Sequence, residues 1–304
     1  MPELPDITIY VEALQRLAEG TTLENLKILN PFVLRTVSPT IEDFSGRELE
    51  AVSRLGKRVV LSFSAEHHAV VHLMVAGRLR WREKTAKPPA RRGLAAWTFS
   101  TGKLILTEAG SKRRASIHLA VGEKALVAHN PGGLEVLDAD LPAFRAAITR
   151  ERHTLKRTLT DPRLLSGIGN AYSDEILHHA RLSPFKLSDS LSDDESARLY
   201  ESVRLHESVV AVLSEWTARL RTEVGDGFPE KVTAFREDMA VHGRFDRPCP
   251  DCGAPVQRIR YADSEANYCA GCQTGGRILA DRSLSRLLKA DWPKTLDDLE
   301  HRGR

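Results

Sequence analysis

Hydrophobic positions near the start of the chain recur with helical spacing. The apolar side chains that share one face are Ile7, Tyr10, Val11, Leu14 and Leu17. Their separations of three and four residues are typical of an amphipathic helix. Gly20 follows them, and glycine commonly ends helices. We therefore predict a helix over residues 3–18.

From about residue 21 to residue 137 the pattern changes to short apolar runs separated by Gly, Ser or Pro. Residues 59–63, 69–73 and 103–107 are clear examples. This alternation of short strands and turns predicts a β-sandwich or a flattened barrel. The stretch 84–93 is polar and basic and contains two prolines, so we expect a mobile loop there.

The pattern becomes helical after Gly133. Helix-like spacing occurs in residues 141–149, 154–160, 170–180, 193–206 and 207–224. The segment Gly225-Asp-Gly227 ends this run, and all four cysteines follow in a module from about 240 to 282. In the last residues, Leu284, Leu287 and Leu288 share one helical face, which we expect to pack against the body of the protein.

Composition excludes several classes of protein. The chain has 304 residues, of which 41% are hydrophobic and 28% are charged, as in ordinary globular proteins. No stretch approaches the ~20 apolar residues that span a bilayer. The N-terminal segment is acidic rather than basic, unlike a secretory signal. With only four cysteines, a disulfide-rich secreted scaffold is disfavoured, and we expect a cytoplasmic protein.

Charge is unevenly distributed, although the net charge is only +3. Basic clusters lie at 54–58, 78–92, 112–114 and 150–163, and acidic residues gather at 189–195 and 297–300. Segregated basic patches are typical of a phosphate-binding face. Each cluster alone is explained equally well as a solvated surface.

The cysteines form two pairs with metal-ligand spacing. Cys249 and Cys252 are followed, after 16 residues, by Cys269 and Cys272. Two CxxC turns at this distance predict a zinc ribbon, and four protein ligands leave no open coordination position, so the single Zn²⁺ would be structural. The other explanation is a redox pair or two buried cysteine pairs.

A glycine-containing turn precedes the helix predicted at 170–180. In Gly167-Ile-Gly-Asn170, the glycines permit a tight turn, and Asn170 is a good N-cap. A helix N-terminus readily binds phosphate, and Lys156 could add positive charge. The same turn also fits a plain corner between packed helices.

The order of these features resembles the formamidopyrimidine-DNA glycosylase and endonuclease VIII family of base-excision repair enzymes. The matching segments are Met1-Pro-Glu-Leu-Pro-Asp6, Leu55-Gly-Lys57, His72-Leu73 with Gly77, Gly167-Ile-Gly-Asn-Ala-Tyr-Ser-Asp-Glu-Ile-Leu177, Val241-His-Gly-Arg244 and Tyr268-Cys-Ala-Gly-Cys-Gln273. Their order is much more specific than any one of them.

The resemblance implies an α+β fold with three parts. They are an N-terminal helix and β-sandwich (1–137), a helical domain with a helix–two-turn–helix (138–239) and a zinc-finger hairpin (240–282), followed by an extension (283–304). It also implies that the partner is damaged or abasic DNA and that the protein is a monomer.

The resemblance further implies covalent catalysis by Pro2. Removal of Met1 would leave a secondary amine with a pKa near ~8, of which a useful fraction is neutral. Such an amine can form a Schiff base with a sugar carbon. Glu3 matches the family's general acid and base, and Lys57 and Asn170 match residues that contact phosphate. Taken without the family, Pro2 could simply permit removal of methionine.

The chain departs from the family pattern where the DNA would be distorted. Met74 and Val75 lie where the family has a methionine that fills the gap left by the everted base. Arg113 or Arg114 matches the inserted arginine, but Ala115 replaces a phenylalanine. The phosphate-binding arginine of the finger aligns with Ser264, and Arg258, Arg260 or Arg277 might otherwise supply that contact. His242 replaces a tyrosine, and Asp6 replaces a glutamate.

Three functions are therefore compared. The first is a DNA glycosylase with abasic-site lyase activity by β/δ-elimination. The second is a lyase-only or non-enzymatic protein that binds damaged DNA on the same fold. The third, an unrelated zinc ribbon that binds nucleic acid, leaves the N-terminus and the Gly-Ile-Gly-Asn turn unexplained. We predict the first. The sequence does not identify the damaged base or distinguish duplex from single-stranded substrates.

Overall fold

The computed structural model describes residues 1–109, 112–191, 195–233, 235–260, 265–280, 287 and 292–302. Contacts divide the chain into two compact units. The N-terminal unit comprises Met1–Gly132 and Glu215–Ala234, and the C-terminal unit comprises Gly133–Ser214 and Phe235–Arg304. The division into four segments stays a prediction.

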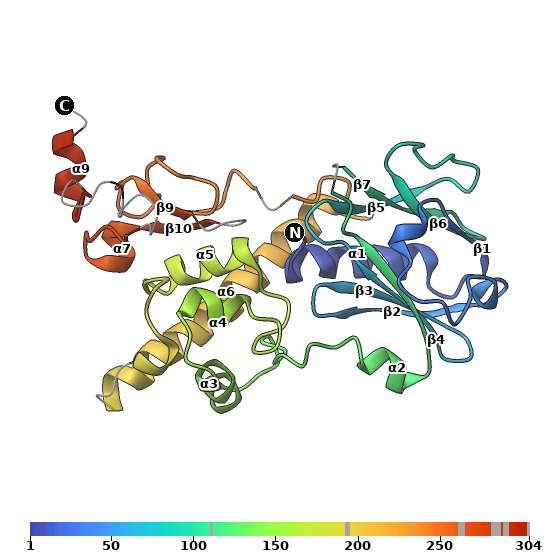
Figure 1. Ribbon diagram of the computed structural model, residues 1–304, viewed down its shortest axis with the longest axis horizontal. Helices are drawn as coiled ribbons and strands as arrows, with labels where there is room; N and C mark the ends of the chain where they lie inside the picture. Colours follow the sequence, from blue (N-terminus) through green and yellow to red (C-terminus); the bar gives the residue numbers. More distant parts are fainter. Residues whose placement is uncertain are drawn as a thin grey trace. The chain divides into compact units, whose positions relative to one another are not determined.

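The N-terminal unit contains two antiparallel four-stranded sheets (Figure 1). One has the order β1 (Leu23–Ile28), β6 (Gly93–Phe99), β7 (Lys103–Glu108) and β5 (Gly77–Arg82). The other has the order β2 (Leu49–Leu55), β3 (Arg58–Phe63), β4 (His67–His72) and β8 (Ser116–Val121). The short helices α2 (Glu123–Val127), η1 (Pro31–Val33) and η2 (Glu42–Phe44) complete the unit. The predicted β-sandwich is confirmed.

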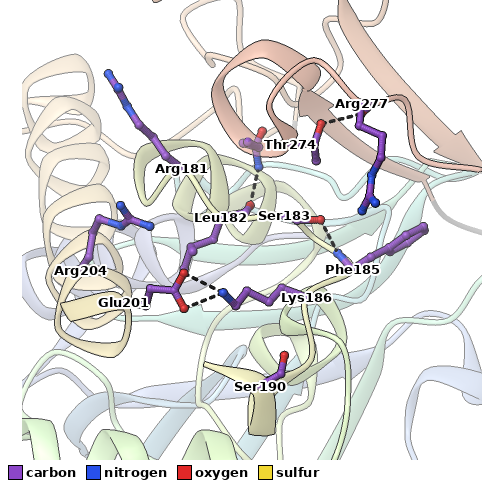
Figure 2. Close-up of a pocket in the computed structure, with 11 residues that line it drawn as sticks. Arg181, Leu182, Ser183, Phe185, Lys186, Ser190, Glu201, Arg204, Thr274 and Arg277 are labelled. Carbon is purple, nitrogen blue, oxygen red and sulfur yellow. Dashed lines mark hydrogen bonds and ion pairs between the residues drawn. The ribbon is translucent and has the colours of Figure 1, made fainter. Parts of the chain in front are cut away.

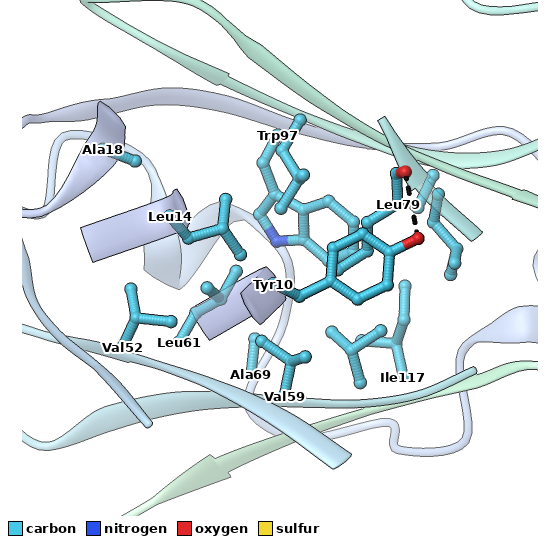
Figure 3. Close-up of a cluster of buried hydrophobic side chains, with 14 of the residues drawn as sticks. Tyr10, Leu14, Ala18, Val52, Val59, Leu61, Ala69, Leu79, Trp97 and Ile117 are labelled. Atoms are coloured by element: carbon cyan, nitrogen blue, oxygen red, sulfur yellow. Dashed lines mark hydrogen bonds between the residues drawn. The ribbon is translucent and has the colours of Figure 1, made fainter. Parts of the chain in front are cut away.

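Helix α1 (Leu4–Ala18) contributes to the core between these sheets. Figure 3 shows Tyr10 and Leu14 of α1 among side chains from both sheets, including Trp97 on β6 and Leu61 on β3. Tyr10, Leu14, Trp97 and Leu61 are all fully buried. The apolar face predicted from the spacing is thus the face that packs, and the helix predicted over 3–18 is confirmed.

The C-terminal unit begins with helices. They are α3 (Leu141–Thr149), α4 (Leu155–Thr160), α5 (Asn170–His179) and α6 (Glu195–Val224), with η3 (Ser188–Ser190) before α6. The prediction of separate helices at 193–206 and 207–224 was wrong, because one 30-residue helix covers both and continues into the N-terminal unit. None of the helices in the described part of the chain is long and apolar enough to cross a membrane.

A hairpin of β9 (Val256–Arg260) and β10 (Glu265–Cys269) carries the cysteines, together with α7 (Ala270–Thr274). Trp292, Leu296 and Leu299, the last two from α9 (Leu296–Arg302), pack against the cluster that includes Tyr268. The C-terminal residues therefore do pack back on the body. Leu287, however, is 76% exposed, against our expectation, and Leu284 and Leu288 lie outside the described residues.

Candidate active site and metal centre

The N-terminal residues form the start of α1. Pro2 and Glu3 are buried and directly precede Leu4, the first helical residue. The backbone N–H of Glu3 donates to the Asp6 carboxylate at 3.0 Å, so the shorter acid at this position still closes the first turn. The remaining N–H groups of a helix start create a positive potential. The chain terminus therefore lies at a site that favours the neutral form of an amine.

Burial lowers the pKa of the terminal amine, carried here by Met1, below its ordinary value. The cations of Arg78 and Lys57 lower it further, while the carboxylates of Glu3 and Asp6 raise it. Because only the neutral amine is a nucleophile, a lowered pKa increases the reactive fraction at neutral pH.

Lys57 lies at the tip of the hairpin between β2 and β3. The connection is only Gly56-Lys57, since Leu55 pairs with Arg58 in the ladder, and Gly56 adopts a φ of +61°. Burial lowers the pKa of the Lys57 ammonium, and the charge of Glu3 opposes this. The structure thus brings Glu3, Lys57 and the chain terminus together, as the family resemblance implied.

Met74 and Val75 lie in the turn between β4 and β5. Met74 adopts a φ of +53°, and the side chain of Val75 is 61% exposed at the tip. Arg78 donates to the Val75 carbonyl at 3.1 Å, and a Cβ at Gly77 would collide with the carbonyl oxygen of Leu73. This turn is therefore tightly constrained, and it presents a small apolar side chain to solvent.

The segment before β8 is held by Glu108. This buried carboxylate accepts the backbone N–H groups of Arg114 and Ala115 at 3.0–3.2 Å. The side chains of Arg113 and Arg114 are exposed, whereas Ala115 is 3% exposed and belongs to the sandwich core. Position 115 is therefore a packing position, and only the arginines are available to a ligand.

Asn170 does not cap α5 as we expected. The N-cap is Gly169, and Asn170 is the first helical residue. Its side-chain amide donates instead to the carbonyl of Glu265 on β10 at 2.9 Å. A local helix cap could be predicted from sequence, but this contact joins residues 95 positions apart. Asn170 therefore links the start of α5 to the finger hairpin.

Lys156 is buried in an internal network rather than presented on the surface. Its ammonium donates to the Asp174 carboxylate and to the Asn170 carbonyl, each at 2.6 Å. The other oxygen of Asp174 lies 2.7 Å from Nδ1 of His242. The replacement of tyrosine by histidine at 242 thus leaves a buried polar contact, and Lys156 positions Asn170.

We expect Lys156→Met to lower the free energy of unfolding by about 3 kcal/mol, because it leaves a buried carboxylate without its cation. Chemical denaturation measures this, and the double variant Lys156→Met with Asp174→Leu should recover part of the loss. Unchanged stability with weakened DNA binding would show that the ammonium serves a phosphate instead.

Two adjacent acids inside α5 were not predicted as important. Glu175 accepts the backbone N–H groups of Ala240, Val241 and His242 at 2.7–3.0 Å. Burial raises the pKa of Glu175, and these three hydrogen bonds oppose the shift. The signal in the sequence was a pair of acids, Asp174 and Glu175, within an otherwise apolar helix.

The four cysteines converge on one point. Their sulfur atoms all lie within 4.8 Å of one another, with 3.3 Å between Cys252 and Cys269 and 3.9 Å between Cys249 and Cys272. Tetrahedral Zn–S bonds of about 2.3 Å place sulfur atoms roughly 3.8 Å apart. The cluster therefore fits one Zn²⁺, and no pair is joined as a disulfide.

The chemistry of the thiols also fits a cation. Burial raises the pKa of Cys269 to about 12. A bound Zn²⁺ would hold the sulfurs as thiolates instead. His178 on α5 lies beside this cluster, with Nε2 3.3 Å from the Cys249 sulfur. No motif indicated His178, which is 71 positions from Cys249.

Arg260 is exposed at the end of β9. Its neighbour Arg258 instead lies over the ring of Phe245, 4.1 Å from the centroid. Ser264 is outside the described residues, so its predicted loss of a phosphate contact remains untested. Of the arginines on β9, Arg260 is the one that a ligand could reach.

Taken together, the fold and these sites define an α+β protein with a four-thiolate metal centre and an N-terminal amine suited to covalent catalysis. The formamidopyrimidine-DNA glycosylase N-terminal domain matches residues 1–117, and the H2TH domain of the same enzymes matches residues 133–218. The chain therefore belongs to the formamidopyrimidine-DNA glycosylase family, and this places it among the base-excision DNA glycosylases.

Individual proteins agree. The formamidopyrimidine-DNA glycosylase of Heliobacterium modesticaldum is 31% identical over 90% of this chain and 100% of its own length. An uncharacterized formamidopyrimidine-DNA glycosylase-like protein of Mycobacterium tuberculosis is 43% identical over 52% of this chain and 93% of its own. The crystal structure of the Thermus thermophilus protein has a TM-score of 0.73 at 28% identity, covering 90% of this chain and 98% of that one.

Proposed function

We propose that this protein removes a damaged base from DNA and then cleaves the resulting abasic site, with the Pro2 amine as nucleophile. It would act as a monomer in the cytoplasm. The observation that carries the proposal is the burial of the chain terminus at the start of α1, beside Glu3, Lys57 and Arg78, where the pKa of the amine is lowered. Membership of the glycosylase family supports it.

The first step needs a neutral secondary amine. Removal of Met1 exposes the Pro2 nitrogen, which attacks C1′ of the damaged nucleotide. The bond from C1′ to the base breaks, and the base leaves with a proton. Glu3 protonates O4′ as the sugar ring opens, so the nitrogen lone pair forms an iminium with C1′. The ammonium of Lys57 is suited to hold the phosphate beside this sugar.

The second step uses the iminium as an electron sink. A base, for which Glu3 is suited after losing its proton, removes a proton from C2′. The electron pair forms the C1′–C2′ enamine and then expels the 3′ phosphate by breaking the C3′–O bond. A second elimination at C5′ releases the other phosphate, and water returns Pro2 to the free amine. No external oxidant or reductant is required.

The remaining predicted residues would hold DNA. Arg113, Arg114 and the tip formed by Met74 and Val75 are suited to the space vacated by an everted nucleotide. In the C-terminal unit, Asn170 and Arg260 are suited to phosphates, and Lys156 supports Asn170. The thiolates of Cys249, Cys252, Cys269 and Cys272 would hold one Zn²⁺, which supplies folding energy to the hairpin.

The pH dependence of adduct formation tests the environment of the amine. We expect the rate of borohydride trapping to rise with pH as the amine loses its proton, with a midpoint below the ordinary value near ~8. Arg78→Met removes a cation that lowers this pKa and should move the midpoint to higher pH. Arg78→Lys keeps the charge and is the matched control. Equal midpoints in both variants and the wild type would contradict this account.

A second candidate is a lyase-weighted or purely binding protein. Ala115 lies in the sandwich core and the exposed tip is a small valine, so the part of the chain that fills the vacated stack is reduced. A smaller wedge offsets less of the cost of eversion, which is a few kcal/mol. Substrates that lack a base would be affected least.

We therefore expect faster cleavage of abasic duplex than of duplexes with oxidised purines or pyrimidines. A panel of lesion oligonucleotides, assayed as duplex and as single strand, measures this. Val75→Met should increase excision of intact oxidised bases while changing abasic cleavage little. Strong and equal cleavage of 8-oxoguanine and abasic duplexes by the wild type would exclude the lyase-weighted candidate; binding without any adduct would exclude catalysis.

A further inference from the structure

A second concave site lies within the C-terminal unit, at the opposite end of α5 from Asn170. It is a pocket of about 450 Å³ between the turn after α5, helix α6 and the end of α7 (Figure 2). Four cationic side chains line it: Arg181, Lys186, Arg204 and Arg277. Its one lining carboxylate is Glu201. The helix rise of 1.5 Å per residue places Asn170 and Arg181 roughly 16 Å apart.

The charges of this pocket are not balanced. Lys186 pairs with Glu201, with its ammonium 2.6–2.7 Å from both carboxylate oxygens, as Figure 2 shows. The carboxylate is thereby used, and the guanidinium groups remain in excess. Within the described part of the chain, Arg181 and Arg277 form no ion pair, and both are exposed. The lining thus carries a surplus of positive charge from separate segments.

The backbone of Arg181 gives an independent reason to assign a role to its side chain. The N–H of Leu182 donates to the Leu177 carbonyl at 3.0 Å, and that of Arg181 donates to the His178 carbonyl at 2.9 Å. These bonds form a Schellman motif, in which the residue after the C-cap is left-handed and is usually glycine. Arg181 occupies that position with a φ of +53°. An arginine at this position costs stability that glycine would not.

We propose that this pocket is a phosphate-binding site, distinct from the site at Asn170. Guanidinium groups bind phosphate oxygens through paired, charge-assisted hydrogen bonds, and Arg181 and Arg277 approach from different segments. Glu201 keeps Lys186 occupied and so leaves phosphate recognition to the arginines. The phosphate is either that of a DNA backbone beyond the lesion or a free phosphate ion. The chemistry is the same for both, and only the source differs.

Inorganic pyrophosphate is the probe for the site, with the zinc-loaded full chain studied by isothermal titration calorimetry. We expect the wild type to bind it and Arg181→Gly to weaken binding by about tenfold or more, with a further loss on adding Arg277→Ser. Arg219→Ser is the matched control, since it removes one exposed arginine on α6 that does not line the pocket. Its affinity should equal that of the wild type.

Thermal unfolding makes the test independent of misfolding. Because glycine suits the left-handed position, Arg181→Gly should leave Tm unchanged or raise it while losing the phosphate. The proposal is overturned if the wild type binds no pyrophosphate, or if Arg181→Gly binds as well as Arg219→Ser. A lower Tm with unchanged affinity would likewise overturn it, by showing that Arg181 only supports the end of the helix.

The source of the phosphate is resolved with abasic duplexes of two lengths. If it is DNA, Arg181→Gly weakens binding to the longer duplex and reduces its salt slope by about one, and the short duplex is unaffected. If it is a free ion, both duplexes bind as in the wild type although pyrophosphate binding is lost. Each result supports a phosphate site and identifies its occupant. Catalysis by Pro2 is not tested by this measurement, so either proposal can fail alone.

Discussion

Retention of Met1 is expected to abolish the covalent adduct with abasic DNA. A residue before Pro2 converts the secondary amine to an amide, which has no basic lone pair with which to attack C1′. Loss of the nucleophile should lower borohydride trapping by more than about 10³-fold. The comparison uses two preparations that differ by one residue, one beginning at Pro2 and one retaining Met1, each incubated with the same abasic duplex.

Binding is the internal control for this result. Both preparations should shift the abasic duplex in a gel to a similar extent, because the lysine and arginine contacts are unchanged. If the preparation with retained Met1 formed adduct at the same rate, the nucleophile would have to be a side-chain amine, and the role of Pro2 would be wrong.

Loss of one zinc ligand should have the second large effect. In Cys272→Ser the tetrahedral set is incomplete, and apparent zinc-binding energies of about 10–16 kcal/mol are folding energy for such small modules. We expect the variant to lose stoichiometric zinc and its hairpin to unfold. Affinity for abasic duplex should fall by about 100-fold or more, since Arg260 and the Asn170–Glu265 contact depend on this hairpin.

The wild type treated with a chelator should behave like Cys272→Ser and recover when Zn²⁺ returns. Metal content, measured by a colorimetric zinc assay after thiol modification, should be one ion per chain for the wild type. Full DNA affinity in a chain shown to be free of metal would contradict a structural zinc site.

Features with a local origin could be predicted from sequence. The apolar period of α1 and the alternation in β3, β4 and β7 gave the sandwich, and the CxxC spacing gave the cluster of sulfurs. The mistaken break in α6 also has a local reason. Residues 195–224 contain no glycine or proline, so nothing in the sequence interrupts the helix, and the change in apolar phase near residue 206 was not sufficient evidence for two helices.

Features set by distant partners could not be predicted. Lys156 was expected at a phosphate, but Asp174, 18 positions away, holds its ammonium in the interior. Asn170 was expected as a cap, but its amide binds a strand of the finger hairpin. Burial of Ala115 depends on how β8 enters the sandwich core. In each case the residue type was informative, and the tertiary contact decided its role.

The most direct test is to find which nitrogen carries the sugar. The adduct formed with abasic duplex is reduced with borohydride, digested and sequenced by mass spectrometry. We predict that the deoxyribose fragment is attached to the peptide that starts at Pro2, through its imino nitrogen. Attachment to Lys57, or to any other side chain, would contradict the account.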